Sequence, residues 1–545
     1  MRAFSQLLDR LILTPQRNGK LRLLKDYFAM TPDPERGLAL AVITGQLNLP
    51  SAKPAMLREL IQSRMDPVLF ALSYDYVGDL AETISLAWPE KTSPDLPNSD
   101  LHLSAIVETL LKTSRRETPA LVEAWLDRSD SSVRYALLKL LTGGLRVGVS
   151  ARLAKTALAL LGEHDVDEIE EIWHGLEPPY ETLFAWVEGT GPRPENDNPA
   201  PFRPAMLAHP IQDDDFAKLD AGDFSAEFKW DGIRVQASAG LAPDGTLRRA
   251  LYSRTGEDIA RAFPDLMEAL DADMTIDGEL LVLIEGRVQP FNVLQQRLNR
   301  KTVSAKMMHA YPAHIRAYDL LVEKGTDLRV LPFSERRKRL EQAVATLATS
   351  RIDISPLVNF DTWDAVAAAR HTPADHGAGV DADAVEGLML KRWDSAYVPG
   401  RPKGPWFKWK RDPLSVDAVL MYAQRGHGKR SSFYSDYTFG VWRGEELVPV
   451  GKAYFGFTDE ELKEIDRFVR NNTINRFGPV REVTHSQEVG LVLEVAFEGL
   501  NRSTRHKSGV AMRFPRVARL RWDKPPAEAD RLESLEALLP REDSV

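Results

Sequence analysis

Apolar residues in the N-terminal part of the chain recur at the spacing of three and four positions that is typical of one helix face. The clearest run consists of Leu103, Ile106, Val107, Leu110 and Leu111. Similar patterns predict helices at Leu7–Leu13, Gly37–Thr44, Ala55–Arg64 and Ser132–Leu141. We therefore expect residues 1–188 to form an all-α domain.

The next segment, GTGPRPENDNPAPFRP, has a different composition. It is rich in Pro, Gly and Asn and offers few side chains for a core. Residues 189–204 are therefore expected to be a linker.

Residues 205–412 combine strand-like and helix-like patterns. EFKWDGIRVQAS and RRALYSR flank a turn at Pro243-Asp244-Gly245 and predict a β-hairpin. Further strands are predicted for TIDGELLVL, HIRAYDLLV and AVEGLMLKRW, and helices for Arg261–Leu270, Pro290–Leu298 and Ser334–Ala345. This mixture indicates an α+β domain with antiparallel sheets.

Residues 413–524 carry mainly strand-like runs, namely VDAVLMYAQ, DYTFGVWR, GLVLEVAFEGL and VARLRW. One helix is predicted at Thr458–Asn471, because Thr458 is suited to the N-cap and acidic residues follow in the first turn. Five or so short strands with one helix indicate a small β-barrel of the OB type. The polar tail, residues 525–545, is expected to be frayed.

Composition narrows the class of protein. The 545 residues are 43% hydrophobic and 27% charged, as in ordinary globular proteins. The chain has no window of roughly 18 uninterrupted apolar residues and no secretory cleavage site, so we expect a cytoplasmic protein without a membrane partner. The absence of cysteine excludes disulfides and thiolate zinc sites. With a net charge of −9, any contact with nucleic acid must come from local basic surfaces.

The sharpest motif is Glu227-Phe228-Lys229-Trp230-Asp231-Gly232-Ile233-Arg234. Alone, a lysine followed by Asp-Gly could be an exposed amine beside a hairpin. Other fragments, however, follow it in order: Ser253-Arg254, Asp277-Gly278-Glu279, Ala317-Tyr318-Asp319-Leu320-Leu321, Glu386-Gly387-Leu388-Met389-Leu390-Lys391, Trp406-Phe407-Lys408-Trp409-Lys410 and Arg513-Phe514-Pro515-Arg516.

This ordered series resembles the covalent nucleotidyltransferases, the superfamily of DNA ligases, RNA ligases and mRNA capping enzymes. Its details are similar to those of ATP-dependent DNA ligases of the bacterial, three-domain, eukaryote-like type. The resemblance covers about Arg203 to Lys524 and, more weakly, LLTGGLRVGVS at residues 140–150. It implies a helical DNA-binding domain, an adenylation domain and an OB domain that together seal nicked duplex DNA.

The resemblance implies that Lys229 attacks ATP and carries AMP, which passes to a DNA 5′-phosphate before the phosphodiester forms. Free lysine titrates near about 10.4, so the nucleophile must be driven toward its neutral amine. We expect positive charge from Lys408, Lys410, Arg234 and a bound Mg²⁺ to do this. Asp231 belongs to the same catalytic signature, and Gly232 would let the backbone approach the nucleotide.

The resemblance assigns further roles around the nucleotide. Glu227 and Tyr318 match positions that recognise and stack on adenine, and Arg234 and Arg254 match nucleotide-binding positions. Glu279 and Glu386 would hold Mg²⁺, or Mn²⁺, through carboxylate oxygens. Lys408 and Lys410 alternate along a strand, so they share a face and can neutralise the α-phosphate. Arg521 and Lys524 would orient the departing pyrophosphate.

Three basic segments are candidate DNA contacts. The expected residues are Arg513 and Arg516 in the last motif, Arg425, Lys429 and Arg430 in a glycine-rich loop, and Gly144, Arg146 and Gly148 with Arg134 and Lys139 nearby. Taken alone, the last segment is more typical of a turn between helices with glycine C-caps than of a DNA contact.

Several alternatives remain. An RNA ligase or a capping enzyme would share the lysine motif but would not need a large helical DNA-binding domain. An NAD⁺-dependent ligase is disfavoured by the missing cysteines, and an inactive DNA-binding scaffold by the intact motif residues. We expect a monomer associated with the bacterial nucleoid that acts on nicked duplex DNA in repair, with helicase or nuclease partners.

Overall fold

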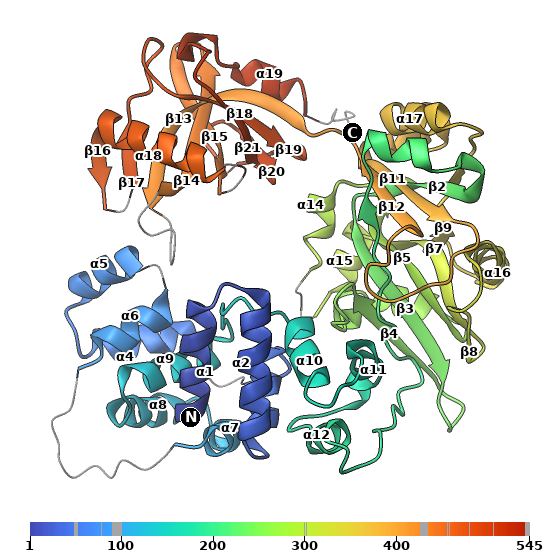
Figure 1. Ribbon diagram of the computed structural model, residues 1–545, viewed down its shortest axis with the longest axis horizontal. Coiled ribbons are helices and arrows are strands. Elements are labelled where there is room, and N and C mark those ends of the chain that lie inside the picture. The colour runs from blue at the N-terminus through green and yellow to red at the C-terminus, as the bar shows by residue number, and fades with distance from the viewer. Residues whose placement is uncertain are drawn as a thin grey trace. The chain divides into compact units, whose positions relative to one another are not determined.

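The computed structural model describes residues 1–47, 49, 53–77, 79–89, 101–298, 300, 302–425, 434–454, 456, 458–478, 480–504 and 506–539 (Figure 1). The chain divides into two compact units, Met1–Lys410 and Arg411–Val545. None of the described helices is both long and apolar enough to cross a membrane.

Before His209, the secondary structure of the described residues consists of helices. They are α1 (Arg2–Leu13), α2 (Arg17–Met30), α3 (Glu35–Ile43), α4 (Pro54–Gln62), α5 (Pro67–Val77), α6 (Leu80–Ala87), α7 (Leu103–Lys112), α8 (Thr118–Asp127), α9 (Ser131–Thr142), α10 (Ala151–Ala159), α11 (Val166–Ile172) and α12 (Glu181–Val187). The run in α7 buries Leu103, Ile106, Val107 and Leu110, but Leu111 is 58% exposed and does not belong to the buried face.

The segment expected to be a linker without a core packs against the sheet that follows it. Ala200 and Phe202 are buried and contact Ala250 and Tyr252. The ring of His174 lies 5.6 Å from that of Phe202 and 4.8 Å from that of Tyr252. The expectation that this segment has little to bury is therefore wrong at Ala200 and Phe202.

Two mainly antiparallel sheets follow (Figure 1). The first has the order β1 (His209–Pro210), β12 (Trp406–Lys410), β11 (Val385–Arg392), β2 (Phe224–Trp230) and β10 (Leu357–Val358). The second has the order β4 (Leu247–Ser253), β3 (Ile233–Leu241), β5 (Met274–Ile284), β7 (Ala313–Glu323) and β8 (Thr326–Asp327), with β6 (Arg287–Val288) beside β5 and β9 (Ile352–Ile354) beside β7. The predicted turn at Pro243-Asp244-Gly245 joins β3 to β4.

The run EFKWDGIRVQAS is not one strand, as we expected, but the end of β2 and the start of β3 in different sheets. The chain crosses at Asp231-Gly232, where the Asp231 N–H donates to Ala384 O at 2.7 Å. A β-carbon on Gly232 would lie 2.5 Å from Leu280 O, so only glycine fits beside β5. Protein packing thus requires this glycine, and the approach of the backbone to the nucleotide stays a prediction.

Five helices lie among these strands, namely α13 (Pro264–Ala269), α14 (Phe291–Leu294), α15 (Ala305–Ala310), α16 (Phe333–Thr346) and α17 (Trp363–His371). The helix predicted at Arg261–Leu270 begins only at Pro264, which occupies the first turn because proline lacks an N–H. The helix predicted at Pro290–Leu298 is a single turn, α14.

The described part of the second unit contains nine strands rather than five. They are β13 (Leu414–Arg425), β14 (Tyr434–Arg443), β15 (Glu446–Ala453), β16 (Thr473–Phe477), β17 (Val480–Val483), β18 (Val492–Phe497), β19 (Gly499–Arg502), β20 (Val510–Arg513) and β21 (Arg516–Arg521). The long β13 pairs with β14 on one side, and on the other with β18 and then β17. Helix α18 (Asp459–Asn472) begins as predicted, with Thr458 and Glu461 in a capping box.

The tail that we expected to be frayed packs onto this unit over its described part. It contains α19 (Leu532–Glu536), whose Leu532 and Leu535 join the core and are 4% and 1% exposed. The Trp442 Nε1–H donates to Pro526 O at 2.7 Å. The tail up to residue 539 is therefore part of the fold, and the expectation of fraying was wrong there, although Leu532, Leu535, Leu538 and Leu539 recur at a helix-like spacing.

Replacing Leu535 by alanine tests this packing. Leu535→Ala should lower the free energy of unfolding of the C-terminal unit by about 2–5 kcal/mol, because it leaves a cavity in the core. Leu538→Ala is the control, since Leu538 is 42% exposed. Urea unfolding of both variants measures the difference. Equal stability of the two variants would mean that the tail does not hold the core.

Candidate active site

One face of the first sheet collects most of the motif side chains. In the register of β2, β11 and β12, Lys229 lies opposite Gly387, and Gly387 opposite Lys410. The next aligned rows are Glu227, Met389 and Lys408, and then Ser225, Lys391 and Trp406. Because neighbouring strands put paired residues on the same face, these side chains form one surface, and Lys408 and Lys410 share it as predicted.

A β-bulge brings Glu386 to Lys229. Val385 pairs with Trp230 and Gly387 with Lys229, so Glu386 is the extra residue of β11. Lys229 Nζ donates a short hydrogen bond to Glu386 Oε1, and Lys410 Nζ lies 3.6 Å from Glu386 Oε2. Gly387 has a φ of +147°, and a β-carbon there would lie 2.3 Å from Trp409 O. Glycine therefore permits the bulge.

Glu227 takes part in a buried charge cluster that the sequence did not reveal. Lys391 Nζ lies 2.9 Å from Glu227 Oε1, and both side chains are almost fully buried. The same ammonium lies 4.5 Å from the ring centroid of Tyr318. Arg337 Nη1, from α16, lies 3.9 Å from Glu227 Oε2. Strand alternation could have found Lys391, which shares a face with Met389 and Gly387, but nothing in the sequence marked Arg337.

Tyr318 also lies at a β-bulge. Asp277 pairs with Asp319 and Gly278 with Ala317, which leaves Tyr318 as the extra residue of β7. Its burial raises the pKa of its hydroxyl well above the ordinary value, so the ring is a neutral, partly buried surface beside Lys391. The structure thus brings Tyr318 and Glu227 together at Lys391.

Arg234 is bound mainly to the protein. Its guanidinium donates to both carboxylate oxygens of Asp277 at 3.0 and 2.6 Å, to Met206 O at 2.6 Å and to the Tyr397 hydroxyl at 3.0 Å. The Tyr397 hydroxyl in turn donates to Asp277 at 2.6 Å. Four of the five N–H groups are therefore engaged. Because Asp277 balances its charge, Arg234 adds less positive charge at Lys229 than we expected.

Burial and neighbouring like charges destabilise the charged forms of two side chains of the site, Glu279 and Lys408. Burial raises the pKa of Glu279 to about 8, and the charge of Glu386 adds to this effect. The pKa of Lys408 lies below its ordinary value because of burial and because Arg401, Lys229 and Lys410 are close. Arg254 is exposed and lies close enough to Arg401 for their like charges to repel. Such a site can bind ligands that carry both an anion and a cation.

No group of three or more His, Cys, Asp and Glu side chains among the described residues is arranged to hold a metal ion. The two expected ligands, Glu279 on β5 and Glu386 on β11, come from different sheets. They interact electrostatically, since the charge of Glu386 raises the pKa of Glu279. Two hard carboxylates are thus available, fewer than a site built from protein alone would have.

The predicted pyrophosphate and OB-domain DNA residues lie in the second unit. Arg521 and Lys524 both contact Asp417 Oδ2, at 3.1 and 2.8 Å. Arg513 ends β20, and Arg516 lies 3.9 Å from Glu498. Arg425 ends β13, whereas Lys429 and Arg430 are outside the described residues.

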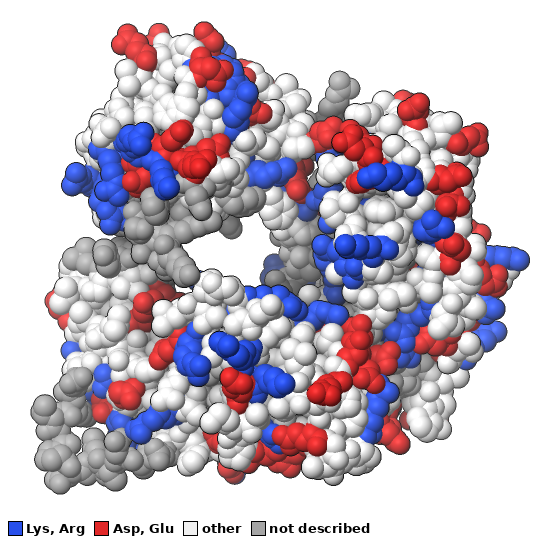
Figure 2. Space-filling view, viewed as in Figure 1, with Lys and Arg blue, Asp and Glu red and all other residues white. Residues whose placement is uncertain are grey.

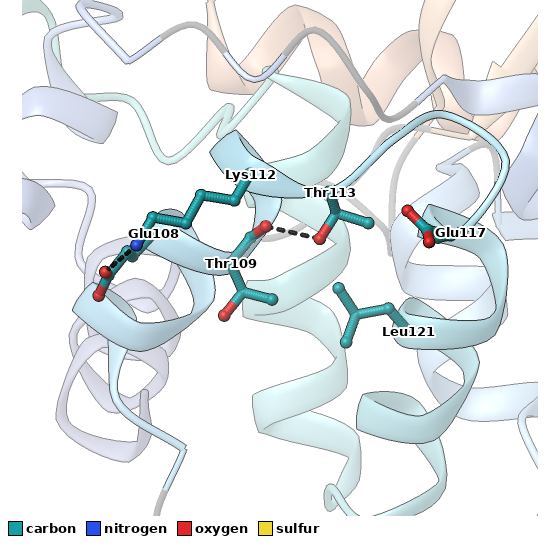
Figure 3. A pocket seen from close by; sticks show the side chains of 6 residues that line it. All are labelled: Glu108, Thr109, Lys112, Thr113, Glu117 and Leu121. Atoms are coloured by element: carbon teal, nitrogen blue, oxygen red, sulfur yellow. Dashed lines mark hydrogen bonds and ion pairs between the residues drawn. The ribbon is translucent and has the colours of Figure 1, made fainter.

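Figure 2 shows Lys and Arg gathered over β16 and β17, among otherwise mixed charges. Arg476 and Arg481 lie in these strands, and the sequence analysis did not select them. A hollow of about 580 Å³ between α7 and α8 has both signs of charge, with Lys112 bound to Glu108 at 2.5 Å (Figure 3). We assign it no role in the chemistry.

In the N-terminal helices, the loop between α9 and α10 contains the third predicted DNA segment. Gly143 ends α9 with a φ of +73°, which is the helix-terminating role of glycine that the sequence left open. Arg146 is exposed and has a φ of +50°. Arg134 and Lys139 are buried, and Lys139 pairs with Asp79. Contrary to our expectation, neither belongs to this surface.

Comparison with known proteins gives one consistent result. The family described as ATP dependent DNA ligase domain matches residues 205–410, and the ATP dependent DNA ligase C terminal region matches residues 430–524. A probable DNA ligase of Koribacter versatilis is 30% identical over 99% of this chain and 96% of its own length. DNA ligase 1 of Korarchaeum cryptofilum is 28% identical over 98% and 97%.

A solved structure named Pmar-Lig_PreS3 has a TM-score of 0.57 at 15% identity and covers 95% of this chain and 99% of its own. That likeness concerns the fold alone. The similarity in sequence to the Koribacter protein spans both units and includes the helical N-terminal part. The chain therefore belongs to the ATP-dependent DNA ligases.

Proposed function

We propose that Lys229 is the residue of this ligase that carries AMP. The observation that supports it most is the single sheet face on which Lys229 lies beside Glu386 and Lys410. Lys229 Nζ attacks the α-phosphorus of ATP, an N–P bond forms, and the bond to the pyrophosphate oxygen breaks. AMP then passes to the 5′-phosphate at a nick, and the 3′-hydroxyl displaces AMP to form the phosphodiester.

Attack requires a neutral amine, and in the structure the Lys229 amine is paired with the Glu386 carboxylate. We assign Mg²⁺, or Mn²⁺, to Glu279 and Glu386, with phosphate oxygens and water as the other ligands. This fits the donor set, and the raised pKa of Glu279 indicates a carboxyl that lacks a compensating cation. A divalent cation there would neutralise the carboxylate that holds the Lys229 ammonium and would offset phosphate charge.

The phosphate is assigned to Lys408 and Lys410. The lowered pKa of Lys408 reflects burial and then crowding by like charges, and an anionic α-phosphate would relieve the crowding. Adenine is assigned to Tyr318, Glu227 and Lys391, since a ring can stack on Tyr318 within reach of the buried ion pair. Arg254 is assigned to the nucleotide, whereas Arg234 acts on it by holding β3 against Asp277.

For the whole chain, we assign residues 1–188 to DNA binding, 205–412 to adenylation and 413–524 to an OB domain. Arg146, Gly144 and the basic residues of the last motif are the proposed DNA contacts, and Arg521 and Lys524 are assigned to pyrophosphate. None of these contacts reads sequence, as expected for an enzyme that acts at any nick. Repair of nicked duplex DNA by a monomer is the role we propose.

The covalent step is tested first at Lys229. Incubation with Mg²⁺ and α-labelled ATP should leave one labelled AMP per chain, stable to base and labile to acid. Lys229→Ala should abolish labelling, and so should Lys229→Arg, because a guanidinium stays protonated. Lys403→Ala is a control that removes an exposed lysine. Labelling that survives in Lys229→Ala would assign AMP to another residue.

The two groups of cations should differ in the step they serve. Lys410→Ala should slow both self-adenylation and sealing of a nick that already carries 5′-AMP, by roughly 10²-fold or more, because its charge lies at the reacting phosphate. Arg521→Ala and Lys524→Ala should slow adenylation but affect the pre-adenylated nick much less, since no pyrophosphate leaves there. Single-turnover assays of both steps measure this. Equal damage to both steps in Arg521→Ala would contradict the pyrophosphate assignment.

The raised pKa of Glu279 predicts a pH dependence of stability. Between its ordinary value of 4.5 and about 8, the folded chain retains a proton that the unfolded chain has lost. Stability should therefore fall as pH rises through this window. Glu279→Gln is neutral throughout, so it should gain stability relative to the native chain up to about pH 8 and no further.

Denaturant unfolding without divalent ions measures this difference at each pH. Adding Mg²⁺ above pH 8 should stabilise the native chain more than Glu279→Gln, because the bound cation favours the carboxylate. A difference between the two proteins that does not change with pH would mean that Glu279 is not held protonated by its surroundings.

A further inference from the structure

A basic hollow lies where the loop between α9 and α10 meets the start of α2. Its volume is about 620 Å³, and it is lined by Pro15, Arg17, Lys20, Arg146, Val147, Gly148, Val149, Ser150 and Leu153. Three of these side chains are cationic and none is acidic. The hollow is thus suited to an anion, in contrast to the mixed charges of the hollow between α7 and α8.

The amine of Lys20 is directed to the loop backbone. Lys20 lies in the first turn of α2, is 8% exposed, and donates to Val147 O at 2.6 Å and to Gly148 O at 3.0 Å. Two carbonyl oxygens beside the hollow are therefore bound to a positive charge. Without it, their partial negative charges would oppose an anion there.

Gly148 makes this contact possible. It has a φ of +66°, and a β-carbon at this position would lie 2.4 Å from Lys20 Nζ. This glycine, which we expected to admit DNA, makes room for the lysine amine. Gly144 differs, because a β-carbon there would have no heavy atom within 4 Å and its open side remains accessible.

Arg146 lies directly before the two bound carbonyl groups. It is exposed and holds a φ of +50°, a conformation that costs energy for a residue with a β-carbon. Such a conformation persists only where neighbouring contacts fix it. The two hydrogen bonds from Lys20 fix the following residues, and so set the position from which the Arg146 side chain leaves the loop.

We propose that Lys20 is a positioning residue that presents this loop to a backbone phosphate of duplex DNA, with Arg17 and Arg146 as the contacting cations. The inference rests on the proposed DNA-binding function of residues 1–188 and adds a mechanism to it. Lys20 binds the backbone of the loop, and the two arginines that line the hollow neutralise the phosphate.

The test uses the full chain and a labelled, nicked duplex. Lys20→Met keeps the length of the side chain but removes the amine, and should weaken DNA binding by roughly 10-fold at physiological salt. It should raise KM for nicked DNA while leaving kcat at saturating DNA and self-adenylation unchanged. Lys25→Met is the matched control, because it removes the same charge from an exposed position on the same helix and should leave DNA binding unchanged.

A double-mutant cycle separates positioning from simple loss of charge. Arg146→Ala should weaken binding and lower the slope of log affinity against log salt by about one. In the Lys20→Met background it should have almost no further effect, because the displaced loop has already lost the contact. Arg17→Ala should remain additive, since Arg17 is not carried by the loop. Gly148→Ala, which displaces the amine from the other side, should reproduce the effect of Lys20→Met.

The outcomes distinguish the two proposals. If Arg17→Ala and Arg146→Ala both bind DNA like the native chain, the DNA-binding role of this region is wrong. If Arg146→Ala weakens binding but Lys20→Met does not, or if their effects multiply, the DNA contact stands and the positioning role of Lys20 is overturned. Thermal unfolding and self-adenylation of each variant show that the chain is folded.

Discussion

The crossing of the chain from β2 to β3 at Asp231-Gly232 is the constraint on which the candidate site depends. Lys229 lies two residues before the crossing and Arg234 two residues after it, so the two side chains belong to different sheets. The crossing is held by the Asp231 N–H and by the contact of Gly232 with Leu280 O. It puts Lys229 at the border of the first sheet, where its charge interacts with that of Glu279 of the second sheet.

The charges gathered at this border are unfavourable to the chain alone. Burial and like charge raise the pKa of Glu279 and lower that of Lys408. Each shift is the energetic cost of keeping a group where its charged form is destabilised. The nucleotide and divalent cation that we propose for this site would supply the opposite charge at both places, so their binding should offset this cost. This is the arrangement expected of a site that is complementary to charge developing during reaction, rather than to its own side chains.

The sequence predicted the geometry correctly where it follows from strand alternation or from helix-capping residues. The same-face pairing of Lys408 and Lys410 follows from strand alternation, and the start of α18 follows from its capping residues. The sequence did not predict contacts between residues that lie far apart along the chain. The buried partners of Glu227 come from β11 and α16, and Lys20 meets a loop 127 residues away. The split of EFKWDGIRVQAS into two strands has no marker except its Asp-Gly pair, which fits a turn or an ordinary strand end equally well.

Two bulges show why motif spacing alone could not give the site. Glu386 and Tyr318 are both extra residues in their strands, and an ideal strand would have turned one or both to the opposite face. Glu386 reaches Lys229 only because Gly387 adopts a φ of +147° against the backbone of Trp409. Gly387 is therefore a geometric requirement of the ion pair between Glu386 of β11 and Lys229 of the neighbouring strand β2. In the same way, Gly232 and Gly148 accommodate Leu280 O and Lys20 Nζ, so three glycines of the motifs make room for neighbouring atoms of the protein itself.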